Sequence, residues 1–369
     1  MLGRPPRLMR SPKMAWLAAA AMILAWTSMG GCASVGPRTV PRDQFDYNGA
    51  IADATQEQLL LNLVRLRYAE SPMFLRVSSV ISQYSRITSL DAAVGVGNAP
   101  PAGTTASGRV GGSVTWADRP TITYIPVSGQ EFSRNLLRPL PPATLFEMMM
   151  SGWPADLVLR VSVWSINQID NAVARPSYQR SADPRLFQLF KVWRRLRLAG
   201  VLGMRKVAVD DDRSELVVFL LDQRASPELA RDITRLRRLL GLDPSIREVR
   251  LTYGLLPDEP DQIAVLTGSV YDIMLNLACQ LDVPEAHVRA GRAARTTRPG
   301  PEGEEPPIQV RFSGEEPKDA FVAVKTQGYW FYIDQNDRES KRAFSFLQLL
   351  LNLAETGSQE QGPLVTISN

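Results

Sequence analysis

FVAVKTQGYWFYIDQNDRESKRAFSFLQLLLNLAETG, residues 321–357, is the stretch whose local fold is easiest to predict. Two runs rich in β-branched and aromatic residues predict two strands, and the apolar residues that follow recur at helical spacing. Asn336 and Glu339 have the spacing of a capping box, and Gly357 stands just past the last apolar position. We therefore predict a strand–turn–helix unit with its helix over residues 337–356.

The second of these strands, GYWFYI, carries alternating aromatic residues. Successive side chains of a strand point to opposite faces, so Trp330 and Tyr332 share one face. Tyr329, Phe331 and Ile333 share the other. If one face packs on the following helix, the other needs cover. A second layer of the same domain is the favoured interpretation, and a partner-binding face is the alternative. Tyr329, Trp330 and Tyr332 are therefore candidate interaction residues.

The remaining chain mixes helical and strand patterns, which predicts an α+β fold with small antiparallel or mixed sheets and two domains. Helices are expected at residues 50–68, 129–137, 142–151, 154–169, 184–199, 227–240 and 271–281. Strands are expected at residues 73–85, 113–127, 247–254 and 262–268, and in a hairpin over 205–221 that turns at residues 210–213.

The expected organisation follows composition shifts along the chain. Its parts are a signal peptide (1–31), a tether (32–48), an N-terminal α+β domain with a β-hairpin (49–180), a middle α/β region (181–290), a charged, Pro/Gly-rich disordered loop (291–307) and a C-terminal strand–helix unit that packs with the middle region (308–369).

A glycine-rich segment at about residues 86–118 predicts the hairpin. Its even-numbered positions are mostly apolar, from Leu90 to Trp116, and its odd-numbered positions are small or polar, as at Asp91 and Ser113. Two strands of about ten residues with this alternation have the length of a membrane-spanning hairpin. One hairpin leaves unpaired edges in lipid, so spanning would require a ring of subunits. A hairpin in water is the favoured interpretation, and Trp116 is a further candidate interaction residue.

The first 31 residues have the pattern of an export signal. A basic head precedes an uncharged apolar run at residues 14–26, and small residues lead to Cys32. This arrangement resembles the bacterial lipoprotein signal, in which the cysteine is acylated and becomes the first residue. The resemblance implies a membrane anchor at Cys32. Because Ala33 and Ser34 follow instead of an aspartate, it also implies the outer membrane, on its periplasmic face.

The charge balance depends on this signal. The full chain has 42 basic and 38 acidic residues, and four of the bases but none of the acids lie in residues 1–31. The remaining chain is therefore neutral, with 38 residues of each sign. A neutral chain of mixed charge gives no general reason to expect nucleic acid as a partner.

Residues that usually carry chemistry are few. His287 is the single histidine, and a structural or surface role is favoured for it. Cys279 lies in an apolar run and is expected to be buried. The sequence has no Cys/His cluster, phosphate-binding loop or nucleophile elbow, and the acids at residues 210–212 lack the spacing of a calcium loop. We expect no enzyme activity, no metal and no cofactor, with an envelope hydrolase lacking a recognisable motif as the least favoured alternative.

Three segments, EQLLLNLVRLRY, RPTITYIPVSGQEF and GYWFYIDQNDRESKRAF, resemble a family of uncharacterised bacterial lipoproteins of proteobacterial type. The resemblance spans most of residues 45–355 and implies no catalytic residues. The sequence therefore predicts an outer-membrane-anchored periplasmic lipoprotein that acts as a structural or interaction component of an envelope assembly, with protein partners or self-association. The alternative is an oligomeric outer-membrane pore or secretion subunit that contributes the hairpin.

Overall fold

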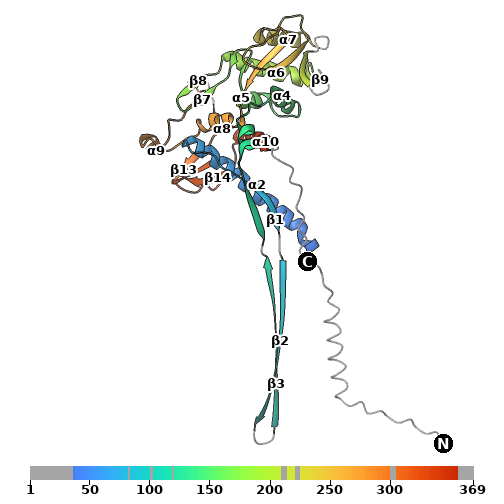
Figure 1. Cartoon of the computed structure of the whole chain (residues 1–369), viewed down its shortest axis with the longest axis vertical. Coiled ribbons are helices and arrows are strands. Elements are labelled where there is room, and N and C mark those ends of the chain that lie inside the picture. The colour runs from blue at the N-terminus through green and yellow to red at the C-terminus, as the bar shows by residue number, and fades with distance from the viewer. Residues whose placement is uncertain are drawn as a thin grey trace, which may run out of the picture. The chain divides into compact units, whose positions relative to one another are not determined.

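The computed structural model describes residues 36–81, 84–99, 103–118, 120–208, 214–220, 225–299 and 305–355. Contacts divide the chain into two units, residues 1–51 with 77–123 and residues 52–76 with 124–369 (Figure 1). Helices and several small antiparallel or mixed sheets make up the described residues, which confirms the predicted α+β class.

The helices of the described residues are α2 (Gly36–Arg67), α3 (Gln130–Leu137), α4 (Pro142–Met150), α5 (Ala155–Ser162), α6 (Pro184–Leu198), α7 (Pro227–Leu240), α8 (Val270–Ala278), α9 (Glu285–Arg289) and α10 (Arg338–Glu355). The strands are β1 (Phe74–Ile81), β2 (Tyr84–Ala99), β3 (Gly103–Asp118), β4 (Thr121–Val127), β5 (Val163–Ile166), β6 (Ile169–Asp170), β7 (Val173–Arg175), β8 (Tyr178–Arg180), β9 (Leu202–Ala208), β10 (Ser214–Leu220), β11 (Glu248–Tyr253), β12 (Gln262–Thr267), β13 (Arg311–Ser313), β14 (Ala320–Thr326) and β15 (Tyr329–Asp334).

The first unit contains the predicted glycine-rich hairpin, formed by β2 and β3 (Figure 1). Antiparallel pairing runs without interruption from Tyr84 opposite Asp118 to Ala99 opposite Gly103. Each strand has 16 residues, against the ten or so that the sequence predicts. At about 3.3 Å per residue the paired strands are about 50 Å long.

Helix α2 differs from the prediction at its start. It begins at Gly36 and includes most of the segment expected to be a tether, residues 32–48. Pro41 lies inside it, where a proline removes one backbone hydrogen bond and argues against a helix. Val40 and Phe45 are exposed, so this part shows no apolar stripe from which a helix could be predicted.

The second part of α2, from residue 52 onward, follows its predicted apolar stripe. Leu59, Leu63 and Leu66 are buried, as are their neighbours Leu60 and Val64. A helix with one buried face packs because apolar surface is removed from water there. The stripe therefore attaches this part of α2 to the core of the second unit.

The main sheet of the second unit has the strand order β6-β5-β12-β11-β10-β9. β11 and β12 run parallel, and the other neighbours are antiparallel. β9 and β10 are the predicted hairpin over residues 205–221, and its turn at 210–213 lies outside the described residues. Helices α4, α5 and α6 contact this sheet, and α7 packs on α6.

The sequence predicts one helix over residues 154–169, and the structure corrects this. Helix α5 ends at Ser162, and the next four residues form the fully buried strand β5. Val163 pairs with Thr267, and Ile166 pairs with Val265 of β12. A short apolar run fits a buried helix or a buried strand equally well, so the available strand partner decides between them.

Helix α7 has the ends that the sequence predicts. The Ser226 hydroxyl accepts a hydrogen bond from the Leu229 N–H at 3.4 Å, and Pro227 is the first helical residue. Gly241 ends the helix with φ 68°, a left-handed conformation that favours glycine.

The C-terminal strand–turn–helix unit is confirmed, with a different helix cap. Asp337 Oδ1 accepts from the Ser340 N–H at 3.0 Å, so Asp337 and not Asn336 caps α10. The Asn336 N–H instead donates to Asp334 Oδ1 at 2.8 Å within the preceding turn. A carboxylate is the better cap here because it also faces the positive end of the helix dipole. Gly357 lies outside the described residues.

The loop predicted to be disordered, residues 291–307, is held in place over residues 291–299. Arg67 donates to the Ala294 carbonyl at 2.6 Å, and the Thr297 N–H donates to the Cys279 carbonyl at 3.0 Å. Composition does not reveal these bonds, because Arg67 lies 227 residues before its partner. The expectation of disorder is therefore wrong for this part of the loop.

Candidate functional site

The register of the hairpin determines which residues share a face. Directly opposite residues of an antiparallel pair lie on the same side of the sheet. Even-numbered residues of β2 lie opposite even-numbered residues of β3, as Leu90 does to Gly112. The mostly apolar positions of both strands therefore share one face. Trp116 lies on that face, opposite Arg86, and its side chain is outside the described residues.

The other face of the hairpin is polar where it is described. The hydroxyls of Ser89 and Ser113 lie 2.7 Å apart, and Asp91 is exposed. In the described residues β2 and β3 pair with each other and with no third strand. Both outer edges consequently present unpaired backbone N–H and C=O groups, and a strand added from another chain would satisfy them.

The strands that flank the hairpin in sequence, β1 and β4, form a second two-stranded sheet. The first six residues of β4 are all exposed. The exposed apolar side chains of this sheet are Leu75, Ile81, Ile122, Tyr124 and Ile125, with exposed fractions from 38% to 57%. Single exposed apolar residues are common, but a set gathered on one small sheet is typical of an interaction surface.

Two amides of α2 hold the start of β1. Asn62 is fully buried and exchanges two hydrogen bonds with the Met73 backbone, at 2.7 and 2.9 Å. One turn earlier, Gln58 exchanges two bonds with the Leu75 backbone, at 3.0 and 2.6 Å. Two alternate residues of an extended segment, Met73 and Leu75, are thus bonded to side chains at positions i and i+4 of a helix. In a sheet the same backbone groups would bond to a neighbouring strand.

The aromatic strand β15 divides as its alternation predicts. Phe331 and Ile333 are fully buried, and Trp330 and Tyr332 are half-buried on the other face. The Lys325 ammonium lies 5.9 Å from the centre of the Trp330 ring. Trp330 and Tyr332 remain candidates for partner contact, because part of each side chain is accessible.

Tyr329, the third candidate on this strand, packs inward and contacts the single histidine. The Tyr329 and His287 rings meet edge to face with centres 5.3 Å apart. His287 is buried, and its Nδ1 lies 2.7 Å from the Tyr68 hydroxyl. Arg292 Nη1 lies 3.4 Å from Nε2. Because arginine can only donate, Nε2 is the acceptor and Nδ1 is left to donate to Tyr68.

Burial governs the ionisation of this cluster. It lowers the pKa of His287, and the nearby Arg292 guanidinium lowers that pKa further. It also raises the pKa of the Tyr68 hydroxyl. A neutral histidine bonded to a neutral tyrosine, with aromatic rings around them, joins α9, β15 and the residue that follows α2. The prediction for His287 was a structural or surface role, and the structure buries the residue in this cluster.

Cys279 is buried, as the sequence predicts, and burial raises the pKa of its thiol. Within the described ranges, no three His, Cys, Asp or Glu residues gather closely enough to hold a metal ion.

No helix in the described part of the chain is both long and apolar enough to cross a membrane. Cys32 lies outside the described residues.

Sequence patterns missed the clamp formed by Gln58 and Asn62. Their signal is two amides at helical spacing inside an otherwise apolar run, EQLLLNL. Buried amides need hydrogen-bond partners, so such a pair indicates a nearby backbone segment but not which segment it is.

Comparison of the chain with protein-family models, with curated proteins and with solved structures gives no match.

Proposed function

We propose that this protein is a lipoprotein of the outer membrane, anchored through Cys32 and facing the periplasm, and that it works as a structural component of an envelope assembly. The hairpin of β2 and β3 supplies its association element. In this function the second unit is the folded body, and the edges of the hairpin pair with strands of further copies of the chain.

The long two-stranded hairpin is the observation that carries this proposal. Its 16-residue strands have no third strand in the described residues. A two-stranded ribbon alone is marginally stable in water, and its open edges accept further strands. The exposed apolar residues of the β1–β4 sheet add surface that association would bury. Most soluble assemblies of identical chains are closed and symmetric.

The test is the native mass of the detergent-extracted protein. A shortened variant replaces residues 93–109 with Asn-Gly, which suits a two-residue turn and leaves Ala92 opposite Val110. A control variant replaces only residues 100–102 with Asn-Gly and keeps both strands. We expect an oligomer for the wild type and the control, and a lower native mass for the shortened variant. An oligomer of unchanged mass in the shortened variant would contradict the role of the hairpin.

The anchor is tested separately by membrane fractionation. Cys32→Ala removes the only site that the lipoprotein signal offers for acylation, so the protein should leave the outer-membrane fraction. If Cys32→Ala stays in that fraction as the wild type does, the lipidation proposal fails. The native-mass test does not depend on this result, because it measures association after extraction.

A second candidate function is an oligomeric outer-membrane pore or secretion subunit. Two features favour it: the strands exceed the 9–11 residues that a spanning strand needs, and the register puts their mostly apolar positions on one face. Ala93→Cys and Val94→Cys, each with Cys279→Ser, place single thiols on opposite faces. If the hairpin lies in lipid, a water-soluble thiol reagent should label position 93 and not position 94. Equal labelling would place the hairpin in water.

A further inference from the structure

The paired helices α6 and α7 of the second unit bear a basic groove. It has a volume of about 640 Å³ and is lined by Gln188 of α6 and by Ala230, Arg231, Thr234, Arg235, Arg238 and Leu239. The three arginines follow one another at four and three residues, so they lie on one face of α7. All three are exposed. The groove therefore presents three guanidinium groups beside the small apolar surface of Ala230 and Leu239.

These arginines have no carboxylate partner among the described residues. Arg235 donates to the amide oxygen of Gln188, a neutral partner, at 2.8 Å. Helix α7 carries two acids: Asp232 pairs with Arg195 at 2.6 Å, and the exposed Glu228 lies three residues before Arg231. Like charges at these spacings destabilise a helix. An acidic partner would offset that repulsion.

An exposed loop of the same unit has the complementary chemistry. It joins β11 to β12 and presents Asp258 and Glu259, both exposed, after the exposed apolar residues Leu255 and Leu256. Two hydrogen bonds with Gln262 hold its acidic part: the Asp258 N–H donates to the Gln262 side chain at 3.1 Å, and the Gln262 N–H donates to the Glu259 carbonyl at 3.2 Å. A loop held in this way loses little conformational freedom on binding.

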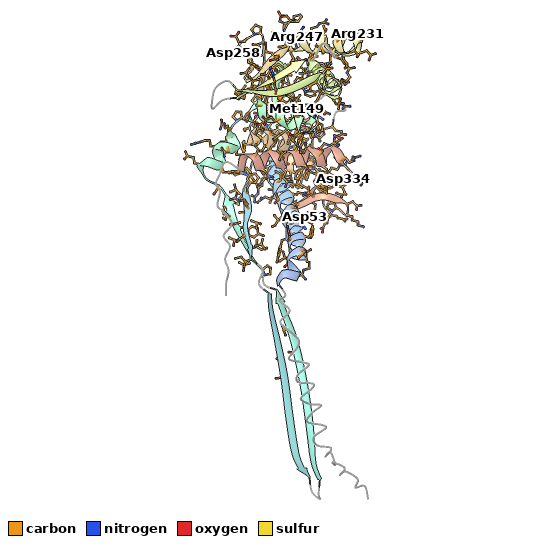
Figure 2. All side chains as sticks on the ribbon, turned by 90° about the vertical axis from the view of Figure 1, so that its right-hand side faces the viewer. Asp53, Met149, Arg231, Arg247, Asp258 and Asp334 are labelled. Carbon is orange, nitrogen blue, oxygen red and sulfur yellow. The ribbon has the colours of Figure 1, made fainter. Side chains whose placement is uncertain are left out.

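Arg231 of the groove and Asp258 of the loop are labelled apart in the second unit. Figure 2 shows Arg231 and Asp258 on opposite sides of the same end of the view. No contact between this loop and the groove is found among the described residues of one copy, so the loop is available to the groove of a second copy. Two different surfaces on opposite sides give a head-to-tail contact, which closes into a ring when the rotation per copy permits.

We propose that the α6–α7 groove binds the acidic loop, residues 255–261, of a second copy of this chain. The carboxylates of Asp258 and Glu259 then meet Arg231 and Arg235, and Leu255 and Leu256 cover the apolar part of the groove. Arginine suits this role because its planar group binds a carboxylate through two parallel hydrogen bonds. This proposal rests on the proposed self-association. It adds a second contact between copies, separate from the contact made by the hairpin.

A charge-reversal experiment tests the contact in the full, detergent-extracted chain. The groove variant carries Arg231→Glu and Arg235→Glu, the loop variant carries Asp258→Lys and Glu259→Lys, and a combined variant carries all four. We expect each reversal to weaken association roughly 10- to 100-fold, because like charges then face each other. The combined variant, and an equal mixture of the groove and loop variants, should regain association. Sedimentation velocity over a concentration series measures each case.

The matched control for the loop variant is Glu315→Lys with Glu316→Lys, which makes the same change of charge at two exposed acids elsewhere. It should associate as the wild type does. Salt gives a test that needs no variant: wild-type association should weaken as the screening length falls from about 10 Å at 0.1 M to about 3 Å at 1 M.

Three results would overturn the inference. In the first, the groove and loop reversals leave the wild-type oligomer unchanged, whereas shortening the hairpin dissociates it. This result rejects the groove contact and is consistent with the proposed function. The second is equal loss of association in the Glu315 and Glu316 control. The third is a wild type that is monomeric at every concentration, which rejects self-association as well.

Discussion

Asn171 holds the point at which helix α5 gives way to strand β5, and its loss should show what that junction contributes. The side chain is 2% exposed. Its Nδ2 donates to the carbonyls of Leu159 at 3.3 Å, Arg160 at 3.0 Å and Val163 at 2.6 Å. Its Oδ1 accepts from the Ala172 N–H at 2.8 Å. One amide therefore bonds the last turn of the helix and the first residue of the strand.

The size of the effect follows from the groups that lose a bond in Asn171→Ala. The Leu159 carbonyl also accepts from the Val163 N–H, so its loss is the smallest. The Arg160 and Val163 carbonyls and the Ala172 N–H each lose this partner. A buried polar group left unsatisfied costs about 1–3 kcal/mol, and water can reach the part-buried ones. We expect the free energy of unfolding to fall by about 2–4 kcal/mol.

Urea unfolding followed by far-ultraviolet circular dichroism measures this change. Asn171→Asp keeps the volume and the acceptor but turns a carboxylate toward the carbonyls, so it should destabilise the protein at least as much as Asn171→Ala. Asn336→Ala, at an exposed turn, is the control and should stay within about 0.5 kcal/mol of the wild type. A loss below about 1 kcal/mol in both Asn171 variants would refute the reasoning that this amide fixes the junction.

Three further predictions concern single residues. Gly268→Ala would place a Cβ 2.7 Å from the Trp164 ring, so it should cost about 1–3 kcal/mol, whereas Gly314→Ala meets open space; equal midpoints of thermal unfolding would contradict this. Ser226→Ala removes the α7 cap and should cost about 1 kcal/mol in urea unfolding, and no change would mean that the 3.4 Å bond carries little weight. Burial lowers the pKa of His287, so the unfolded chain takes up its proton at a higher pH than the folded chain, and stability should fall as the pH drops below about 6.5. His287→Gln should remove that part of the pH dependence, and an unchanged slope would assign it to other groups.

The sequence predicted best the elements whose signals are local. The ends of α7 are determined by residues at the ends themselves: Ser226 and Pro227 at the start and Gly241 at the finish. The structure has each of them where the sequence predicts it. The failures occur where a distant segment decides. β5 is a strand because β12 lies beside it, and residues 291–299 are ordered because Arg67 reaches them. Neither partner is visible in the local pattern.

The same distinction applies to the candidate surfaces. The alternation of apolar and polar residues along one segment was enough to predict the hairpin. The register then places the mostly apolar positions of both strands on one face. The basic groove could not be predicted, because Gln188 and Arg235 become neighbours only when α6 packs on α7. The acidic loop could not be predicted for another reason. Its sequence, LLPDEPD, is typical of an ordinary turn, and only the structure shows that its leucines are exposed.

The two proposed contacts would contribute different things to an assembly. Backbone edges pair with any strand of suitable length, so a hairpin gives association energy with little selectivity. A fixed pattern of charges rejects wrong partners and sets the register, but it adds little affinity when exposed to water. Without its first 31 residues the chain has equal numbers of acids and bases, so copies do not repel one another as whole bodies, and local complementarity decides how they meet. Once one contact forms, the second is made within the same assembly and gains from the high effective concentration. Shortening the hairpin should therefore leave a weak association that salt abolishes, and reversing the groove should leave one that salt hardly affects.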